Sequence, residues 1–342
     1  MGYNPSVIML QKTDKTEALP GVFSTLAAGF ELTTRYLWLM VIPALLDLFL
    51  WIGPRLSFRP LIESLAAQMP TMAEGALITD PALMLETFAS RLNHFTYLSV
   101  SLVGVPALMT GLTPEATPVP TAVIERSGWG EWAGYLMLFT LGGLLLTAVY
   151  YSLIAYALRR ANATNGNGAP FSLGRFLRRT GRTWIRLVGL SALFMIVTLI
   201  ITLPTALLAG FISLLSQAVA SLVIIGALIF LIWIVMFLSY TPQSMTLNPS
   251  GFLPSILAGV RLFRANLPAS LGLLFVVTLL RRLLAVILLS ADSGTWVTAI
   301  NLLAHAYIST ALIIAMFIFY RDRYAAHLQS SLPQTATESL KH

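Results

Sequence analysis

Residues 221–240 read SLVIIGALIFLIWIVMFLSY, a run of twenty residues that contains no charged side chain. A helix of about 20 apolar residues is long enough to cross the hydrocarbon core of a bilayer. The whole chain shares this character, because 57% of its 342 residues are hydrophobic and only 10% are charged, whereas about a quarter of a typical soluble domain is charged. The composition therefore predicts an all-α, polytopic membrane protein in which residues 1–342 form a single membrane domain.

Six runs have the length and hydropathy of membrane spans. They are 36–53, 133–157, 187–209, 217–240, 267–290 and 296–320. With six spans, the lysines and arginines near the N-terminus, in the 158–186 and 241–266 loops and in the C-terminal tail fall on one side of the membrane. By the positive-inside rule that side is the cytoplasm, so we expect a multi-pass protein of the cytoplasmic (inner) membrane with both termini inside.

A long segment, 54–131, separates the first two predicted spans, and we expect it to form an extracytoplasmic helical insert. Within it, HFTYLSVSLVGVPALMTGLT (94–113) has nearly the length of a seventh span. A crossing there would export the 158–186 loop, which carries seven arginines, against the positive-inside rule. We therefore interpret 94–113 as an interfacial or re-entrant part of the insert.

Three segments follow the same order of features: a short amphipathic helix, a polar break, and an apolar hairpin of two spans. They begin near Gly21, Phe171 and Gly251, and they define repeat units of about 21–157, 171–240 and 251–320. Each unit would lay a helix on the membrane interface and then enter the membrane, which gives six transmembrane and three interfacial helices. All three units run in the same direction, unlike the inverted repeats of many transporters.

The second unit opens with the most basic stretch of the chain, FSLGRFLRRTGRTWIRLVGL (171–190). On a helix, which turns by about 100° per residue, the arginines share one face and apolar residues occupy the other. This face carries Arg175, Arg178, Arg179, Arg182 and Arg186. Such segregation is typical of a helix in the interface plane, so we expect these side chains to bind anionic lipid headgroups on the cytoplasmic face. Nucleic acid is not expected as a partner, because the basic face lacks aromatic and polar base readers.

Few ionisable residues lie within the predicted spans, and each is costly there. Asp47 falls near the outer end of the first span, and Arg281 and Arg282 fall in the outer half of the fifth, at a comparable depth. One hypothesis is that Asp47 pairs with one of the arginines between spans. The alternative is that all three side chains reach the outer headgroups and water.

His305, in NLLAHAYIST, follows Asn301 by one helical turn, and this spacing suits hydrogen bonds that pack helices together. Ligation of haem or a pigment is less favoured, because the sequence offers no second histidine within a span, and we expect no cofactor. The chain has no cysteine, no His/Asp/Glu cluster with metal-ligand spacing, and no serine, histidine and carboxylate whose spacing indicates a nucleophilic site. No catalytic or metal-binding residue is predicted.

The layout of interfacial helix followed by hairpin, together with the stretch IPALLDLFLWIGPRLS (42–57), resembles uncharacterised bacterial six-span membrane proteins. These include the membrane domain attached to some glycerophosphodiester phosphodiesterases. The resemblance concerns the arrangement and implies a fold. It carries over no functional residue, and the large external insert departs from the compact layout of that group.

These observations favour a non-catalytic membrane scaffold, or an accessory subunit of a membrane complex, with lipids and a membrane protein as partners. The alternative is a transporter or permease component for an anionic or amphipathic substrate, bound by the arginines of the fifth span. A water-accessible cavity that reaches Arg281 or Arg282 would favour the transporter. A solid bundle with an apolar lateral groove would favour the scaffold.

Overall fold

The computed structural model describes residues 19–68, 87, 89, 92–100, 103–110, 116–162, 172–290 and 293–331. Of these described residues, 81% are helical. Five of their helices are long and apolar enough to cross a membrane, so the predicted all-α, polytopic fold class is confirmed. They are α5 (Trp129–Ala161), α6 (Leu173–Ser213), α7 (Gln217–Leu238) with its short continuation α8 (Thr241–Leu247), α10 (Leu267–Leu289) and α11 (Val297–Ser331).

The first predicted span, 36–53, is a short helix joined at a sharp bend to an amphipathic one. α1 (Val22–Arg35) is followed by the 3₁₀ helix η2 (Leu37–Met40) and by α2 (Val41–Ile52), and the two parts meet at 94°. At about 1.5 Å per residue, the 12 residues of α2 measure only ~18 Å, against ~30 Å for the hydrocarbon core. The bend falls at Tyr36, whose ψ of 57° lies outside the helical region. A sixth span is therefore present if α1 and α2 are counted as one bent span.

α1 and α9 (Phe252–Ala265) are built alike. Each has 14 residues and follows a glycine N-cap. Their buried residues occupy corresponding positions: Thr25, Leu26, Gly29, Leu32 and Thr33 in α1, and Ser255, Ile256, Gly259, Leu262 and Phe263 in α9. The central glycines allow close packing, because a Cβ at Gly29 would lie 2.5 Å from the Ala311 carbonyl oxygen and one at Gly259 would lie 3.0 Å from Thr241. α1 thus lies directly on α11, and α9 lies directly on α8.

Each amphipathic segment packs on the last helix of the unit before it: α6 on α5, α9 on α8, and α1 on α11. The contact of α1 with α11 joins the first unit to the third. The break predicted in the second unit is wrong, because α6 continues without interruption from Leu173 to Ser213. In that unit, the basic segment and the following span are one long helix.

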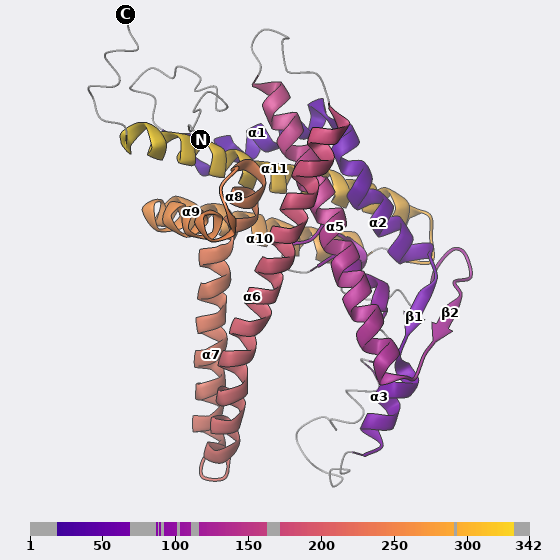
Figure 1. The fold of residues 1–342 in the computed structure, drawn as a ribbon. Helices are drawn as coiled ribbons and strands as arrows, with labels where there is room; N and C mark the ends of the chain where they lie inside the picture. Colours follow the sequence, from indigo (N-terminus) through magenta and orange to yellow (C-terminus); the bar gives the residue numbers. More distant parts are fainter. Residues whose placement is uncertain are drawn as a thin grey trace, which may run out of the picture.

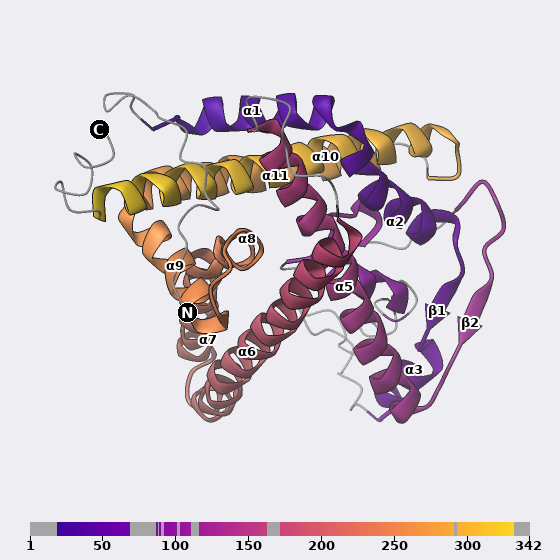
Figure 2. The ribbon, with the colours of Figure 1, turned by 45° about the horizontal axis from the view of Figure 1, so that its top comes forward.

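The hairpin of α6 and α7 extends away from the remaining helices, whereas α1, α10 and α11 lie side by side (Figure 1, Figure 2). Large apolar side chains along the hairpin are exposed, among them Leu207, Phe211, Leu222 and Phe230. A surface of this length and hydrophobicity suits contact with lipid acyl chains.

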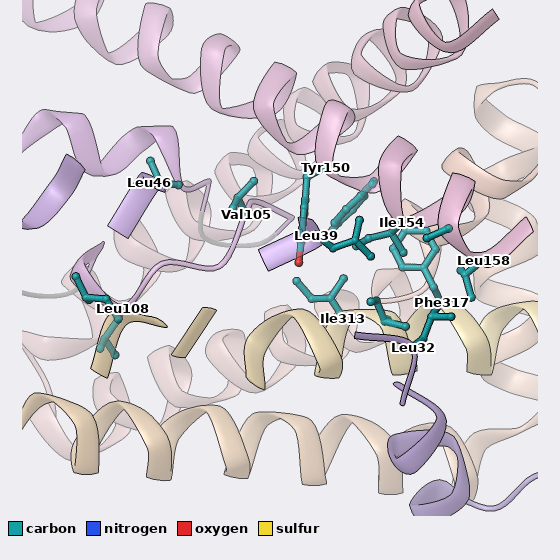
Figure 3. Packing of buried hydrophobic residues seen from close by; sticks show 14 of the residues in the cluster. Leu32, Leu39, Leu46, Val105, Leu108, Tyr150, Ile154, Leu158, Ile313 and Phe317 are labelled. Atoms are coloured by element: carbon teal, nitrogen blue, oxygen red, sulfur yellow. The ribbon is translucent and has the colours of Figure 1, made fainter. Parts of the chain in front are cut away.

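The largest cluster of buried hydrophobic residues joins α1, α2, α5, α11 and the segment 103–110. Tyr150 and Ile154 of α5 face Ile313 and Phe317 of α11 across Leu39 of η2 (Figure 3). α11 is the central helix, because most of its apolar stretch is buried whereas that of α7 is exposed. The packed core therefore lies at the end of the molecule that contains α2.

The insert between α2 and α5 folds back onto the helices. Its short strands β1 (Arg55–Ser57) and β2 (Val123–Glu125) pair in parallel, with Arg55 opposite Val123. α3 (Arg59–Ala66) follows β1, and the 3₁₀ helices η3 (His94–Leu98) and η4 (Leu108–Thr110) pack against α5 and α2. The described part of 94–113 contains no membrane-spanning helix, and Val105 is fully buried in the core. The described residues of this segment reach the core and form no span.

Candidate functional site

Asp47 lies in the middle of α2 and its side chain is completely buried. The Met109 backbone N–H, in η4, donates to Asp47 Oδ1 at 2.9 Å. Burial of a carboxylate costs free energy unless its oxygens accept hydrogen bonds. The apolar residues adjacent in sequence, Leu46 and Leu108, belong to the same core cluster (Figure 3). Asp47 therefore fastens the insert to the helix that precedes it.

The second oxygen of Asp47 bonds to α11. Oδ2 lies 3.1 Å from Nδ1 of His305, and Nε2 of His305 lies 3.0 Å from the Ser309 hydroxyl. His305 is 5% exposed and Ser309 is 1% exposed, so water does not compete for these bonds. An ionised carboxylate only accepts. With Asp47 ionised, a neutral His305 ring donates from Nδ1 to the carboxylate, and its Nε2 accepts from Ser309.

A carboxylate, an imidazole and a hydroxyl in this order form the hydrogen-bonded chain found in hydrolytic triads. The sequence does not reveal this hydrogen-bonded chain, because 258 residues separate Asp47 from His305. The spacing of His305 and Ser309, one helical turn apart, was the only local signal. Ser309 is buried within α11, and a substrate could reach its hydroxyl only if the surrounding helices separated. In the described arrangement the chain of three side chains connects η4, α2 and α11.

The predicted pairing of Asp47 with Arg281 or Arg282 is wrong. Both carboxylate oxygens of Asp47 are bound elsewhere, and no ion pair joins it to either arginine among the described residues. Arg281 instead interacts electrostatically with Tyr150 and Tyr151 of α5. The comparable depth of Asp47 and the two arginines was a poor guide to their contact, since α2 has about half the length of α10.

His305 and Asn301 both make the interhelical hydrogen bonds expected of them, but to different partners. The side-chain amide of Asn301 donates to the Leu288 carbonyl of α10 at 2.9 Å. His305 bonds to α2, as described above. These two residues, one helical turn apart on α11, thus bond to two different neighbouring helices, α10 and α2.

The basic face of α6 divides into inward and outward arginines. Arg179 donates to the carbonyls of Thr246 and Leu247, and Arg186 donates to those of Met245, Asn248 and Pro249. These carbonyls lie at the C-terminal end of α8 or just beyond it. The last turn of a helix has carbonyl groups without intrahelical partners and carries partial negative charge. In the structure these two side chains therefore bind backbone carbonyls of the protein, in place of the lipid headgroups predicted for them.

Arg175, Arg178 and Arg182 are exposed, and their contact with lipid headgroups stays a prediction. Their position on the helix follows from the spacing in the sequence. The sequence does not indicate that the C-terminal end of α8 lies beside the basic face of α6.

His94 is the buried titratable group of the insert, outside the long apolar helices. Its ring packs 4.4 Å from that of Phe58, measured between centroids, and has no exposed surface. Burial lowers the pKa of the His94 imidazole, and neither ring nitrogen forms a well-aligned hydrogen bond within the described residues. His94 is therefore held in its neutral form at neutral pH.

An apolar groove of about 360 Å³ opens on the side of the core. It is lined by Ile42, Leu45, Leu46, Phe49, Leu98 and Leu146, from α2, η3 and α5. A second, more polar cavity lies between α1, α5 and α11, and its lining includes Glu31, Arg35 and Arg321. Neither of these two cavities is lined by Arg281, Arg282 or Ser309.

Comparisons with protein-family models, with curated proteins and with solved structures found no match.

Proposed function

We propose that this protein is a non-catalytic scaffold or accessory subunit of the cytoplasmic membrane that holds lipid in a lateral groove. The observation that carries the proposal is the groove between α2, η3 and α5, whose lining is entirely apolar. The helices behind it form a packed core that is tied by hydrogen bonds between buried polar side chains. A groove backed by a solid core suits an acyl chain.

The orientation is part of the same proposal. Both termini lie on the cytoplasmic side, and the exposed Arg175, Arg178 and Arg182 contact anionic headgroups there. Support comes from the positive-inside rule and from the exposure of these three side chains. A reporter domain fused after Gly166, between α5 and α6, is expected to remain cytoplasmic, and export of that reporter would contradict the orientation.

The groove is tested by lipid crosslinking. The protein is expressed in membranes that contain phospholipids with photoactivatable acyl chains, and the labelled peptides are identified by mass spectrometry. We expect enhanced labelling of α2 around Leu45, because this side chain is 59% exposed and lines the groove.

The matched variants are Leu45→Trp, which fills the groove, and Leu203→Trp, at an exposed position of α6. We expect the first to reduce labelling of α2 and the second to leave it unchanged. Equal labelling of α2 and of the exposed hairpin helices in the unsubstituted protein would contradict a groove that retains lipid.

A transporter component is the second candidate, and Arg281 supports it. This arginine interacts with Tyr150 and Tyr151 and forms no ion pair among the described residues. An intramembrane cation of this kind is a candidate site for an anionic substrate. Uptake of an organic anion into proteoliposomes that is lost in Arg281→Gln would favour the transporter over the scaffold.

A further inference from the structure

A cavity of about 220 Å³ lies where α1, α5 and α11 meet. Its base is apolar, because Leu32, Leu158 and Ile318 line it and are buried members of the largest hydrophobic cluster. Its rim is polar, and the rim side chains are exposed or half-buried: Glu31, Arg35, Asn162 and Arg321. An apolar base with a few polar groups at the opening is the usual layout of a small-molecule site.

Arg321 is held at this rim by two hydrogen bonds. Its Nε donates to Asp322 Oδ1 at 2.8 Å, and its Nη1 donates to Asn162 Oδ1 at 3.1 Å. A guanidinium has five N–H donors, so those of Nη2 stay free for a ligand in the described part of the chain. A guanidinium fixed in this way is oriented in advance for phosphate, which arginine binds through paired hydrogen bonds.

Glu31 and Arg35 add one charge of each sign to the rim. They lie one turn apart on α1, a spacing that brings Cβ atoms to about 5–6 Å. Among the described residues, however, no ion pair joins Glu31 to Arg35 or to Arg321. The cavity therefore presents two cations and a carboxylate that are not paired with one another.

The comparison of α1 with α9 separates these charges from the packing of the helix. The two helices bury residues at corresponding positions. At the positions of Glu31 and Arg35, however, α9 carries Arg261 and Ala265. The packing pattern that the helices share therefore requires neither Glu31 nor Arg35, and both side chains belong to the cavity that only α1 lines.

We propose that this cavity binds a phosphate ester that carries a primary amine, which is the headgroup chemistry of phosphatidylethanolamine. The phosphate contacts Arg35 and Arg321, and the ammonium group donates to Glu31. A purely anionic ligand would be repelled by the carboxylate, whereas a zwitterion complements both signs of charge.

The position of the cavity suits a lipid headgroup. α1 is amphipathic, as are helices that lie at the membrane interface. Trp38, which is 42% exposed, follows the end of α1, and tryptophan is enriched at the depth of the headgroups. The cavity shares no lining residue with the apolar groove, so the inference does not rest on the groove.

The test measures thermal unfolding of the purified full-length protein in an uncharged detergent. It is titrated with dioctanoyl phosphatidylethanolamine, with the phosphatidylglycerol, which lacks the amine, and with the phosphatidylcholine, whose methylated amine cannot donate a hydrogen bond. Because a ligand that binds only the folded state raises its stability by mass action, we expect a saturable rise in Tm that is largest with phosphatidylethanolamine. Glycerophosphoethanolamine, which has no acyl chain, distinguishes the sources: a rise shows that the free headgroup is sufficient, and its absence shows that the ligand is the lipid.

The variants assign the two halves of the headgroup. Glu31→Gln is expected to reduce the response to phosphatidylethanolamine to that of phosphatidylglycerol, and Arg35→Gln and Arg321→Gln are expected to reduce both. Arg261→Gln, at the equivalent position of α9, is the matched control and should keep the preference for phosphatidylethanolamine. If Arg321→Gln does not fold, the variants at the exposed Glu31 and Arg35 decide the question.

The same titrations separate this cavity from the apolar groove. Leu45→Trp, which fills the groove, should keep the preference for phosphatidylethanolamine, because Leu45 does not line the cavity. The absence of a saturable rise in the unsubstituted protein, equal responses to the three lipids, or an undiminished preference in Glu31→Gln would overturn the proposal.

Discussion

The hydrogen bond between Asp47 and His305 should couple α2 to α11 energetically, and Asp47→Asn is the sharpest perturbation of it. Asparagine keeps the size of the side chain and an oxygen that can still accept from the Met109 N–H. It replaces the other oxygen, which lies 3.1 Å from Nδ1 of His305, by an NH₂ group that cannot accept the imidazole proton and can only donate to Nδ1 of the opposite tautomer. The substitution therefore removes the bond between imidazole and carboxylate and preserves the bond to Met109.

The size of the effect follows from the burial of the pair. Interhelical hydrogen bonds in membrane proteins contribute about 0.6 kcal/mol on average and about 1.7 kcal/mol at most in double-mutant cycles, and bonds to a charged group contribute about 1.5–3 kcal/mol. Asp47 is 0% and His305 5% exposed, so we place the coupling at about 1.5–1.7 kcal/mol, where these two ranges overlap.

The assay is a double-mutant cycle with Asp47→Asn, His305→Phe and the double variant, unfolded in mixed micelles with increasing fractions of denaturing detergent. The phenyl ring retains most of the volume of the imidazole and removes both nitrogens. A second cycle, Asp47→Asn with Arg281→Gln, should give a coupling near zero. A coupling below about 0.5 kcal/mol in the first cycle, which is within the additivity error of independent sites, or a larger one in the second, would refute the assignment of His305 as the partner.

Three further predictions concern other parts of the structure. Arg186→Gln should lower the free energy of unfolding by about 1–3 kcal/mol, because it leaves partly buried helix-end carbonyls without these donors. Arg178→Gln, at an exposed position of the same helix, should change it by less than about 0.5 kcal/mol, and chemical unfolding of both variants measures the difference. Because the pKa of His94 is lower in the folded state than its ordinary value, the unfolded chain takes up a proton first as the pH falls. The Tm should therefore fall as the pH drops below about 6.5, and His94→Gln should make this part of the pH profile flatter. Gly29→Ala should be strongly destabilising in thermal unfolding, since its Cβ would lie 2.5 Å from a carbonyl oxygen of α11, whereas Gly210→Ala has open space around it and should be tolerated.

The helices and their order could be predicted from the sequence because hydropathy along the chain is a local property. The run 217–240 corresponds to α7 and the two residues that follow it, and the run 267–290 corresponds to α10 and the residue that follows it. The first run was misjudged in length, since hydropathy does not report where a backbone turns. At Tyr36 the chain leaves the helical conformation and bends by 94°, and apolar residues on both sides of the bend conceal it.

The partners of polar side chains could not be predicted in the same way, because they depend on contacts between distant helices. Asp47 and His305 were both recognised as unusual residues, and only the packing of α2 against α11 brings them together. Likewise, the amphipathic pattern of 171–190 correctly separates basic from apolar residues, but it cannot distinguish an arginine that faces water from one that faces a carbonyl. Arg179 and Arg186 lie seven residues apart, nearly two helical turns, and both face α8.

This division of the arginines has a consequence for the architecture. Arg179 and Arg186 bind the end of α8, and α8 in turn supports α9 through the close contact at Gly259. The basic segment of the second unit is therefore bound to the junction that starts the third, while α1 packs on α11 and joins the third unit to the first. Because these contacts involve segments at the ends of the long helices, the middle and far parts of α6 and α7 stay exposed. A body held together at one end, with an apolar hairpin projecting from it, presents more apolar surface than a bundle packed along its full length, and this geometry supports the proposed lipid-binding scaffold.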